Sequence, residues 1–294
     1  MAEQVTLFDV GVLALLLTWA LCWPRPDRWR TRLRALIALS AALSNGLMVA
    51  ALVWRGLAAG HIPLNTKYEF GLAFIATSTL AYTLIGWRAG WAPLGRVALI
   101  VPLLLAVYVR WGIPASQQAI RPPVPALQSI WLPVHVIAAA IAYGFFAVAF
   151  GAALPAFFTS PASQVNAADE DEQSGGMGEH VADSGGMPGH PMDWRGTMRL
   201  AAQWGYLALT ASLISGAIWA QMAWGRYWSW DPKEVWTLTV WLIYTVCLHA
   251  YYRPGWRERR VAGLALLGFA AVLFTFLGIE SLVRWTAVQS LHVF

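Results

Sequence analysis

The sequence predicts an all-α fold, a polytopic transmembrane bundle of about eight helices with the N-terminus and C-terminus outside. Composition gives the first reason, because 58% of the 294 residues are hydrophobic, only 12% are charged and the mean hydropathy is +0.53. Soluble domains carry about 25% charged residues. The second reason is that no stretch alternates with a period of two, which disfavours a β-barrel and favours helices that satisfy their own backbone amides.

Apolar segments long enough to cross a bilayer, about 20 residues each, give the third reason. They span residues 6–23, 34–54, 68–87, 94–110, 133–157, 199–221, 233–252 and 261–282. Pro93 and Pro102 interrupt the fourth segment and make it the least regular. The first segment lacks a basic n-region and a small-residue cleavage site, so we expect a retained helix and not a signal peptide.

The arginines orient the bundle, because cytoplasmic loops collect basic residues. Thirteen of the 20 basic residues lie beside four alternate loops: Arg25, Arg28, Arg30, Arg32, Arg34, Arg88, Arg96, Arg195, Arg199, Arg253, Arg257, Arg259 and Arg260. If these loops are inside, the loops 55–67, 111–132 and 222–232 and the tail after Leu282 share one outer face. The net charge of +5 then reflects membrane orientation, and we expect no nucleic-acid partner.

Residues 159–193 form the one clear break in composition. They are rich in Ser, Gly and Pro, which predicts a disordered cytoplasmic linker. The linker repeats the pattern Ser-Gly-Gly-Met-x-x-His, which is typical either of a local duplication, the interpretation we favour, or of a soft-metal site. Residues 1–158 then hold segments one to five with the His61 and His135 loops, and residues 194–294 hold segments six to eight.

The chain contains 18 tryptophans, and several lie at segment ends, where amphipathic rings form interfacial belts. Trp23, Trp29, Trp54, Trp87, Trp91 and Trp256 fit such a belt. A second group is too dense for a belt and surrounds the loop between segments six and seven: Trp219, Trp224, Trp228, Trp230, Trp236 and Trp241. This tryptophan-rich loop indicates a flat aromatic platform for a large, planar, apolar ligand.

Asp231 has two compatible interpretations. Asp231, Pro232 and Glu234 match the N-cap, first helical position and capping-box position of a helix start. Asp231 is therefore an expected helix cap for segment seven, and a well-capped helix would also hold the tryptophan-rich loop rigid.

Three of the six histidines share the predicted outer face with this loop, namely His61, His135 and His292. His249 lies instead within segment seven, near its cytoplasmic end, where an ionisable side chain is costly and suggests a function. Imidazole is the usual axial ligand of heme iron. Outer histidines beside a cluster of indoles therefore favour a heme site over isolated interfacial histidines.

Four stretches carry a resemblance to a known family. Residues 217–236, with Trp224, Trp228, Trp230, Asp231 and Trp236, resemble the WWD domain of the CcsA family, also called ResC. Residues 61–69 are similar to the family signature HxPLxNxYE, although Asn-Thr replaces its usual Ser-Asn order. His135 and His292 match the two external heme histidines of the family, and His249 matches its transmembrane histidine.

The resemblance implies that the protein delivers heme b, as cargo, in c-type cytochrome biogenesis. His135 and His292 would be axial ligands at the external WWD site, and His249 would hold heme within the membrane. A CcsB/ResB-type partner would supply the second transmembrane histidine. Together the two chains would form a cytochrome c synthase, a heme lyase that joins heme to the CxxCH thiols of apocytochrome c. The location would be the bacterial inner membrane, among lipid, with the heme platform on the periplasmic face.

Two alternatives remain open. CcmC-like or CcmF-like proteins of another maturation route also carry a tryptophan-rich loop between histidines, but they differ in length. A transporter or channel would show charges along a path through the bundle, and Glu69 and Glu280 are the few candidates. Cys22 and Cys247 form no CxxC pair and are expected to be small apolar fillers.

Overall fold

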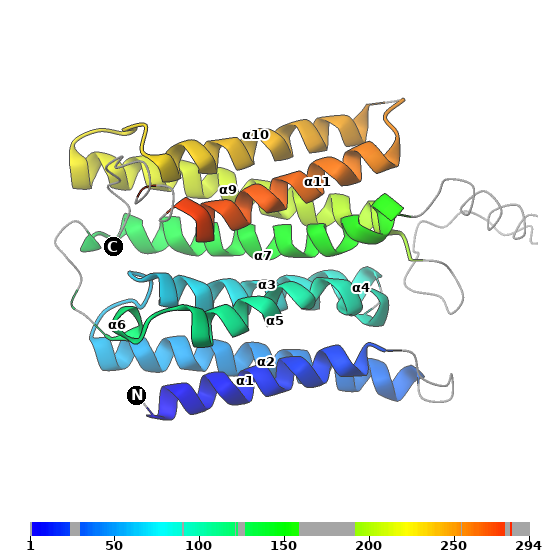
Figure 1. Ribbon diagram of the computed structural model, residues 1–294, viewed down its shortest axis with the longest axis horizontal. Coiled ribbons are helices and arrows are strands. Elements are labelled where there is room, and N and C mark those ends of the chain that lie inside the picture. The colour runs from blue at the N-terminus through cyan, green and yellow to red at the C-terminus, as the bar shows by residue number, and fades with distance from the viewer. Residues whose placement is uncertain are drawn as a thin grey trace, which may run out of the picture.

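The fold is a bundle of long helices that lie side by side (Figure 1). A computed structural model describes residues 2–23, 30–89, 91–120, 122, 127–158, 192–253, 255–279 and 283. The elements are α1 (Ala2–Leu21), α2 (Arg30–Ala59), α3 (Lys67–Ala89), α4 (Trp91–Ala98), α5 (Ile100–Val107), the π-helix η2 (Tyr108–Gly112), α6 (Ala115–Gln118), α7 (Trp131–Phe158), α9 (Trp194–Trp224), α10 (Pro232–Tyr252), α11 (Glu258–Leu273) and the π-helix η4 (Phe274–Gly278).

Over the described residues, each predicted apolar segment lies on a helical rod. Across the described ranges, seven rods are long and apolar enough to cross a membrane: Arg32–Ala59, Lys67–Trp87, Trp91–Gly112, Trp131–Phe158, Trp194–Trp224, Pro232–Tyr252 and Glu258–Gly278. The eighth, α1, has a shorter apolar stretch, Thr6–Leu21, and packs along α2. The prediction of an all-α polytopic bundle is therefore confirmed.

The fourth predicted segment is a composite rod, as its prolines indicated. It consists of α4, α5 and η2 in succession, with Leu99 between α4 and α5 still near helical geometry at φ −77° and ψ −9°. Pro102 lies in the first turn of α5, where its missing N–H removes no intrahelical hydrogen bond. The segment thus spans the bundle despite both prolines.

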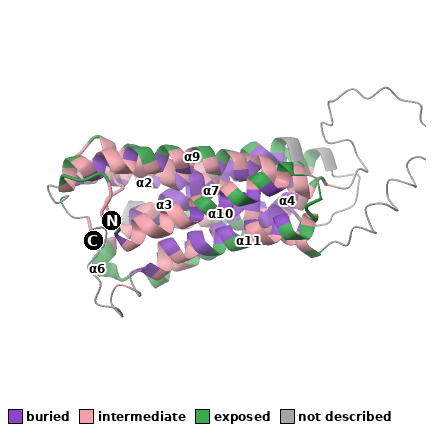
Figure 2. Ribbon diagram, turned by 90° about the horizontal axis from the view of Figure 1, so that it is seen from above, coloured by how far each residue is buried: buried purple, intermediate pink, exposed green. Residues whose placement is uncertain are grey.

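The core centres on α7, which packs most extensively against α9 and also contacts α3 and α11. Small residues permit this close packing. A Cβ atom on Gly144 would lie 2.5 Å from the carbonyl carbon of Thr77, and one on Gly151 would lie 2.6 Å from Cα of Ala98. Buried residues line the inward faces of the rods, and exposed ones lie on the outside (Figure 2).

Trp91 differs from its prediction as an interfacial residue. Its side chain is buried, its ring centroid lies 5.8 Å from that of Tyr82, and the Tyr82 hydroxyl donates to its backbone carbonyl at 2.7 Å. Trp91 is the first residue of α4 and packs against Tyr82 of α3, which explains the burial. Trp23 and Trp87 are exposed, as a belt requires.

The described parts of the loops predicted to be outer gather at one end of the bundle (Figure 1). That end holds α6, the start of α7 and the loop between α9 and α10, whereas the α10–α11 connection and α4 lie at the opposite end. Which end faces the periplasm stays a prediction. Most of the predicted linker, residues 159–191, lies outside the described residues, but Asp193 already caps α9 by accepting from the Gly196 amide at 2.7 Å.

Candidate functional site

A cavity of about 220 Å³ lies at the end of the bundle where these loops gather. We call it the histidine pocket, because His135 lines it. Residues of α3, α7, α9, α10 and η4 build its wall. Its aromatic lining consists of Phe70, Tyr143, Trp219, Tyr227, Trp228 and Phe276, and its charged lining of Lys67, Lys233 and Glu234. Such a pocket suits a flat apolar ligand that also carries charged groups.

His135, in the second turn of α7, is held in one orientation by α9. Its Nδ1 atom lies 2.8 Å from the carbonyl oxygen of Ser212, and the Ser212 hydroxyl donates to the carbonyl of His135 at 3.1 Å. A carbonyl only accepts, so Nδ1 is the donor in this contact. A neutral ring with its proton on Nδ1 has its lone pair on Nε2, which is the tautomer that a metal-ligating histidine requires.

The ring plane of His135 is fixed as well. It stacks with Trp219 at an interplanar angle of 9°, with centroids 6.3 Å apart. A Cβ atom on Gly216 would lie 2.6 Å from Nδ1 of His135, so the imidazole rests directly on α9 at a position that only glycine leaves open. Hydrogen bonding, stacking and close packing therefore preorganise this side chain.

The tryptophan rings do not form one flat surface. Trp219 meets Trp224 at 77°, and Trp228 meets Trp230 at 89°. Trp236 packs on Phe274 with centroids 4.3 Å apart. The reason is that α9 extends to Trp224 and α10 begins at Pro232, so most of these rings project from helices in different directions.

Two of the six rings line the histidine pocket. Trp219 and Trp228 belong to its wall. Trp224 contacts Trp219 and Trp230 contacts Trp228, but neither of these two rings, nor Trp236, is part of the lining. The tryptophans thus contribute two rings to the wall of a pocket and do not form one continuous platform.

Asp231 caps α10, as predicted. Its carboxylate accepts from the Lys233 amide at 2.8 Å, and the Glu234 carboxylate accepts from the Asp231 amide at 3.2 Å, which completes a capping box. Glu234 also accepts from the Ser229 amide at 2.7 Å. Trp230, between these two amides, has a φ of 61° and is 75% exposed. Two hydrogen bonds thus hold a bulky residue in the left-handed region.

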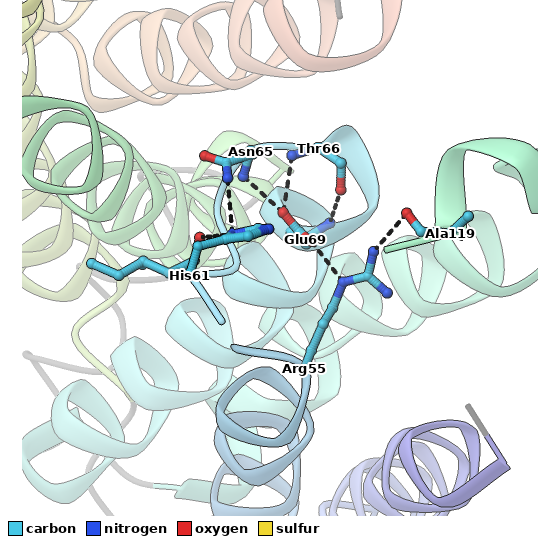
Figure 3. Close-up of polar contacts among 7 residues, drawn as sticks. Arg55, His61, Asn65, Thr66, Glu69 and Ala119 are labelled. Atoms are coloured by element: carbon cyan, nitrogen blue, oxygen red, sulfur yellow. Dashed lines mark hydrogen bonds and ion pairs between the residues drawn. The ribbon is translucent and has the colours of Figure 1, made fainter. Parts of the chain in front are cut away.

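His61 belongs to a polar corner at the start of α3, shown in Figure 3. Its Nδ1 atom lies 3.1 Å from the Asn65 side-chain nitrogen and 3.0 Å from the Ile62 carbonyl oxygen. Asn65 in turn lines the histidine pocket. His61 is therefore a neighbour of the pocket through Asn65, and its own side chain is not part of the lining.

Arg55 and Glu69 anchor this corner, and sequence analysis did not single out Arg55. Their side chains are 1% and 2% exposed and form an ion pair at 2.7 Å. Glu69 also accepts from the amides of Asn65 and Thr66, and Arg55 donates to the Ala119 carbonyl at 3.2 Å. An arginine inside an apolar helix was the available signal for this pair. Glu69 was a candidate for a charged transport path, but its carboxylate forms a structural ion pair with Arg55.

His249 lies far from the pocket, in the last turn of α10. It is exposed, on the same helix face as Leu242 and Val246. His292 lies outside the described residues. The structure thus brings His135, Trp219 and Trp228 together and leaves His249 at the other end of the bundle.

Fold and pocket together define a multi-pass, helical-bundle membrane protein with a preorganised histidine at one end. The solved structure of the cytochrome c heme lyase CcmF is similar in fold, with a TM-score of 0.62 and 19% identity over 97% of this chain. This chain spans about half of that protein, 48% of its length.

Sequence relatives narrow the class. The family model described as cytochrome C assembly protein matches residues 64–285. CcsA of Synechococcus sp. (strain WH7803) is 32% identical over 96% of this chain and 93% of its own length. CcsA of Prochlorococcus marinus (strain MIT 9313) is 31% identical over 84% of this chain and 82% of its own. The chain belongs to the CcsA family of cytochrome c biogenesis proteins.

Proposed function

We propose that this chain binds heme in the histidine pocket and presents it to apocytochrome c, as one subunit of a cytochrome c synthase. The observation that carries the proposal is His135, which lines the pocket and whose imidazole is held in one orientation by the contact of Nδ1 with the Ser212 carbonyl. Neutral imidazole is a common axial ligand of heme iron. The aromatic lining of the pocket favours a large planar ring.

His292 is the second axial ligand in this proposal, by its match to the family's second external histidine. The chain leaves η4 at Gly278, directly after the pocket residues Thr275 and Phe276. The assignment of His292 therefore rests on its match to the family and not on its position in the structure.

The chain contributes positioning to the reaction, and the heme supplies the reactive groups. Each apocytochrome thiol adds across one heme vinyl group. The S–H bond and the π bond are consumed, a C–S and a C–H bond form, and no electrons are gained or lost. The histidine of the CxxCH motif then replaces one protein ligand, which releases the product.

His249 forms half of a second heme station within the membrane in this proposal. Its exposure beside Leu242 and Val246 suits a surface that another membrane chain covers. A CcsB/ResB-type partner would complete this station with its own histidine. Heme would enter there and move to the histidine pocket.

The test is the absorption spectrum of the chain produced and purified together with its CcsB-type partner. We expect b-type heme to copurify and to give a Soret band. His135→Ala should reduce that band, and His292→Ala should do the same. A colourless preparation of the intact complex would contradict the proposal, and a normal spectrum in both variants would remove the axial assignment.

A further inference from the structure

Lysine is almost absent from this chain. Of the 20 lysine and arginine residues, only Lys67 and Lys233 are lysine. Both line the histidine pocket, although they come from α3 and α10, which are far apart in the sequence. The basic residues that orient a membrane protein are arginines here, so orientation does not account for these two lysines.

Helix stability does not account for them either. Lys67 is the first residue of α3, and Lys233 is the second residue of α10. The N-terminal turn of a helix carries positive partial charge, which disfavours a cation and favours an anion. The carboxylates of Asp231 and Glu69 already accept from amides at the starts of α10 and α3. The positive charge offered to the pocket therefore comes from the two lysine side chains, which favour a negatively charged ligand group.

The single carboxylate among the described lining residues, Glu234, is engaged elsewhere. One of its oxygens accepts from the amides of Ser229 and Asp231, and the other accepts from the Ser229 hydroxyl at 3.0 Å. These three hydrogen bonds stabilise the negative charge of Glu234 within the capping box of α10. The charged lining thus favours an anion, with two cations against one carboxylate that already has three donors.

Aromatic rings fix Lys67 at the pocket wall. Its Nζ atom lies 5.6 Å from the ring centroid of Tyr108 and 5.7 Å from that of Phe276. Tyr108 and Phe276 belong to the π-helices η2 and η4, whose wide turns redirect side chains. Cation–π contacts keep the ammonium group beside the apolar part of the pocket.

We infer that Lys67 and Lys233 form a carboxylate subsite that binds the two propionate groups of heme. This inference rests on the proposed function and adds how the ring is oriented. The ammonium groups pair with the carboxylates through charge-assisted hydrogen bonds. The propionate edge is held at the starts of α3 and α10, and the vinyl-bearing part of the ring is left for the incoming thiols.

The experiment compares hemin with hemin dimethyl ester, in which both carboxylates are masked. Each is titrated by absorbance into the purified complex with its partner, in a His249→Ala background so that the histidine pocket reports the binding. Lys67→Met and Lys233→Met should each weaken hemin binding about tenfold and leave ester binding unchanged. Lys67→Arg and Lys233→Arg keep the charge and should retain most of the preference for hemin.

Arg226→Met is the matched control, because Arg226 is exposed in the loop between α9 and α10 and does not line the pocket. It removes one positive charge nearby and should leave both affinities unchanged. Equal weakening of hemin and ester in the lysine variants would overturn the inference, and so would unchanged hemin binding. If the parent complex bound neither compound, the proposed function itself would fall.

Amine labelling gives a second readout, because the chain has only two lysine side chains. Acetylation of Lys67 and Lys233, followed by mass spectrometry, should slow at least fivefold with bound hemin and less with bound ester. Equal rates with and without hemin would overturn the inference even if a variant failed to fold.

Discussion

The two ends of α10 are built in opposite ways. At the Pro232 end, Asp231 is 4% exposed and caps the helix, and four other elements close around a pocket. At the Tyr252 end, His249 is exposed beside apolar side chains. The difference teaches that this chain preorganises His135 within a pocket by itself, whereas His249 lies on an exposed helix face outside that pocket.

Replacing the histidine at each end separates the two stations and has the largest expected effect. His135→Ala should lower the yield of mature cytochrome c by more than roughly 100-fold, because an axial ligand is lost. External imidazole should restore part of it. His249→Ala should lower the heme that copurifies but leave the pocket able to bind added heme. Heme-stained cytochrome yield and the Soret absorbance measure both effects. Normal cytochrome c maturation in His135→Ala would contradict the role of His135 as an axial ligand in the pocket.

The buried ion pair at the pocket end allows a stability test. Glu69→Gln leaves Arg55 charged and buried, and we expect it to cost about 3–5 kcal/mol of unfolding free energy. The exposed pair of Arg110 and Asp9, at 3.3 Å with side chains 38% and 45% exposed, is the control. Arg110→Met should cost less than about 1 kcal/mol.

Unfolding in detergent and hemin titration measure the consequences of Glu69→Gln. The pocket should lose affinity, because Asn65 and Thr66 lose the carboxylate that accepts from their amides. Heme at the His249 end should be retained. A loss in Glu69→Gln no greater than in Arg110→Met would show that the corner is not an anchor.

Gly216→Ala tests the preorganisation of His135. The added methyl group would meet Nδ1 of His135 at 2.6 Å and push the imidazole from its stacked position. We expect roughly a tenfold loss of heme affinity, the size of effect typical of disturbed ligand orientation. Gly46→Ala is the control, since nothing lies within 4 Å of its added Cβ. Equal heme affinity in Gly216→Ala and Gly46→Ala would mean that heme binding does not require the observed orientation of the His135 ring.

Trp230→Gly has the smallest expected effect. Glycine adopts the φ of 61° without a Cβ penalty, so the unfolding free energy should rise by about 1 kcal/mol. Trp230→Ala removes the same ring but keeps a Cβ, and should give no such gain. Thermal unfolding of the two variants distinguishes them. A destabilised Trp230→Gly would indicate that the indole ring contributes packing that outweighs the backbone strain.

Much of the fold could be predicted from the sequence, because the length of an apolar segment is a local property. The helix start at Asp231 was equally predictable, since Asp, Pro and Glu at fixed spacing satisfy the first amides of a helix. The heme-site residues recognised by resemblance, including His292 and His249, stay predictions.

The geometry of the pocket could not be predicted, because it depends on contacts between distant segments. Nothing in the sequence pairs His135 with the carbonyl of Ser212, or Arg55 with Glu69. The flat platform expected from tryptophan density is also absent, because spacing along a chain does not say where each ring points once α9 and α10 extend toward the loop. Lys67 and Lys233 went unnoticed, since their convergence is visible only in three dimensions.

Because α10 is continuous, its length sets the distance between the pocket end of the helix and His249. From Asp231 to His249 a straight α-helix spans about 27 Å at 1.5 Å per residue, far more than the width of one heme. If heme binds at both ends as proposed, a single heme cannot contact both stations, and we expect a loaded complex to hold two hemes at once. Heme counted per complex would then exceed one when the cargo is plentiful, and would return toward one when either station is removed.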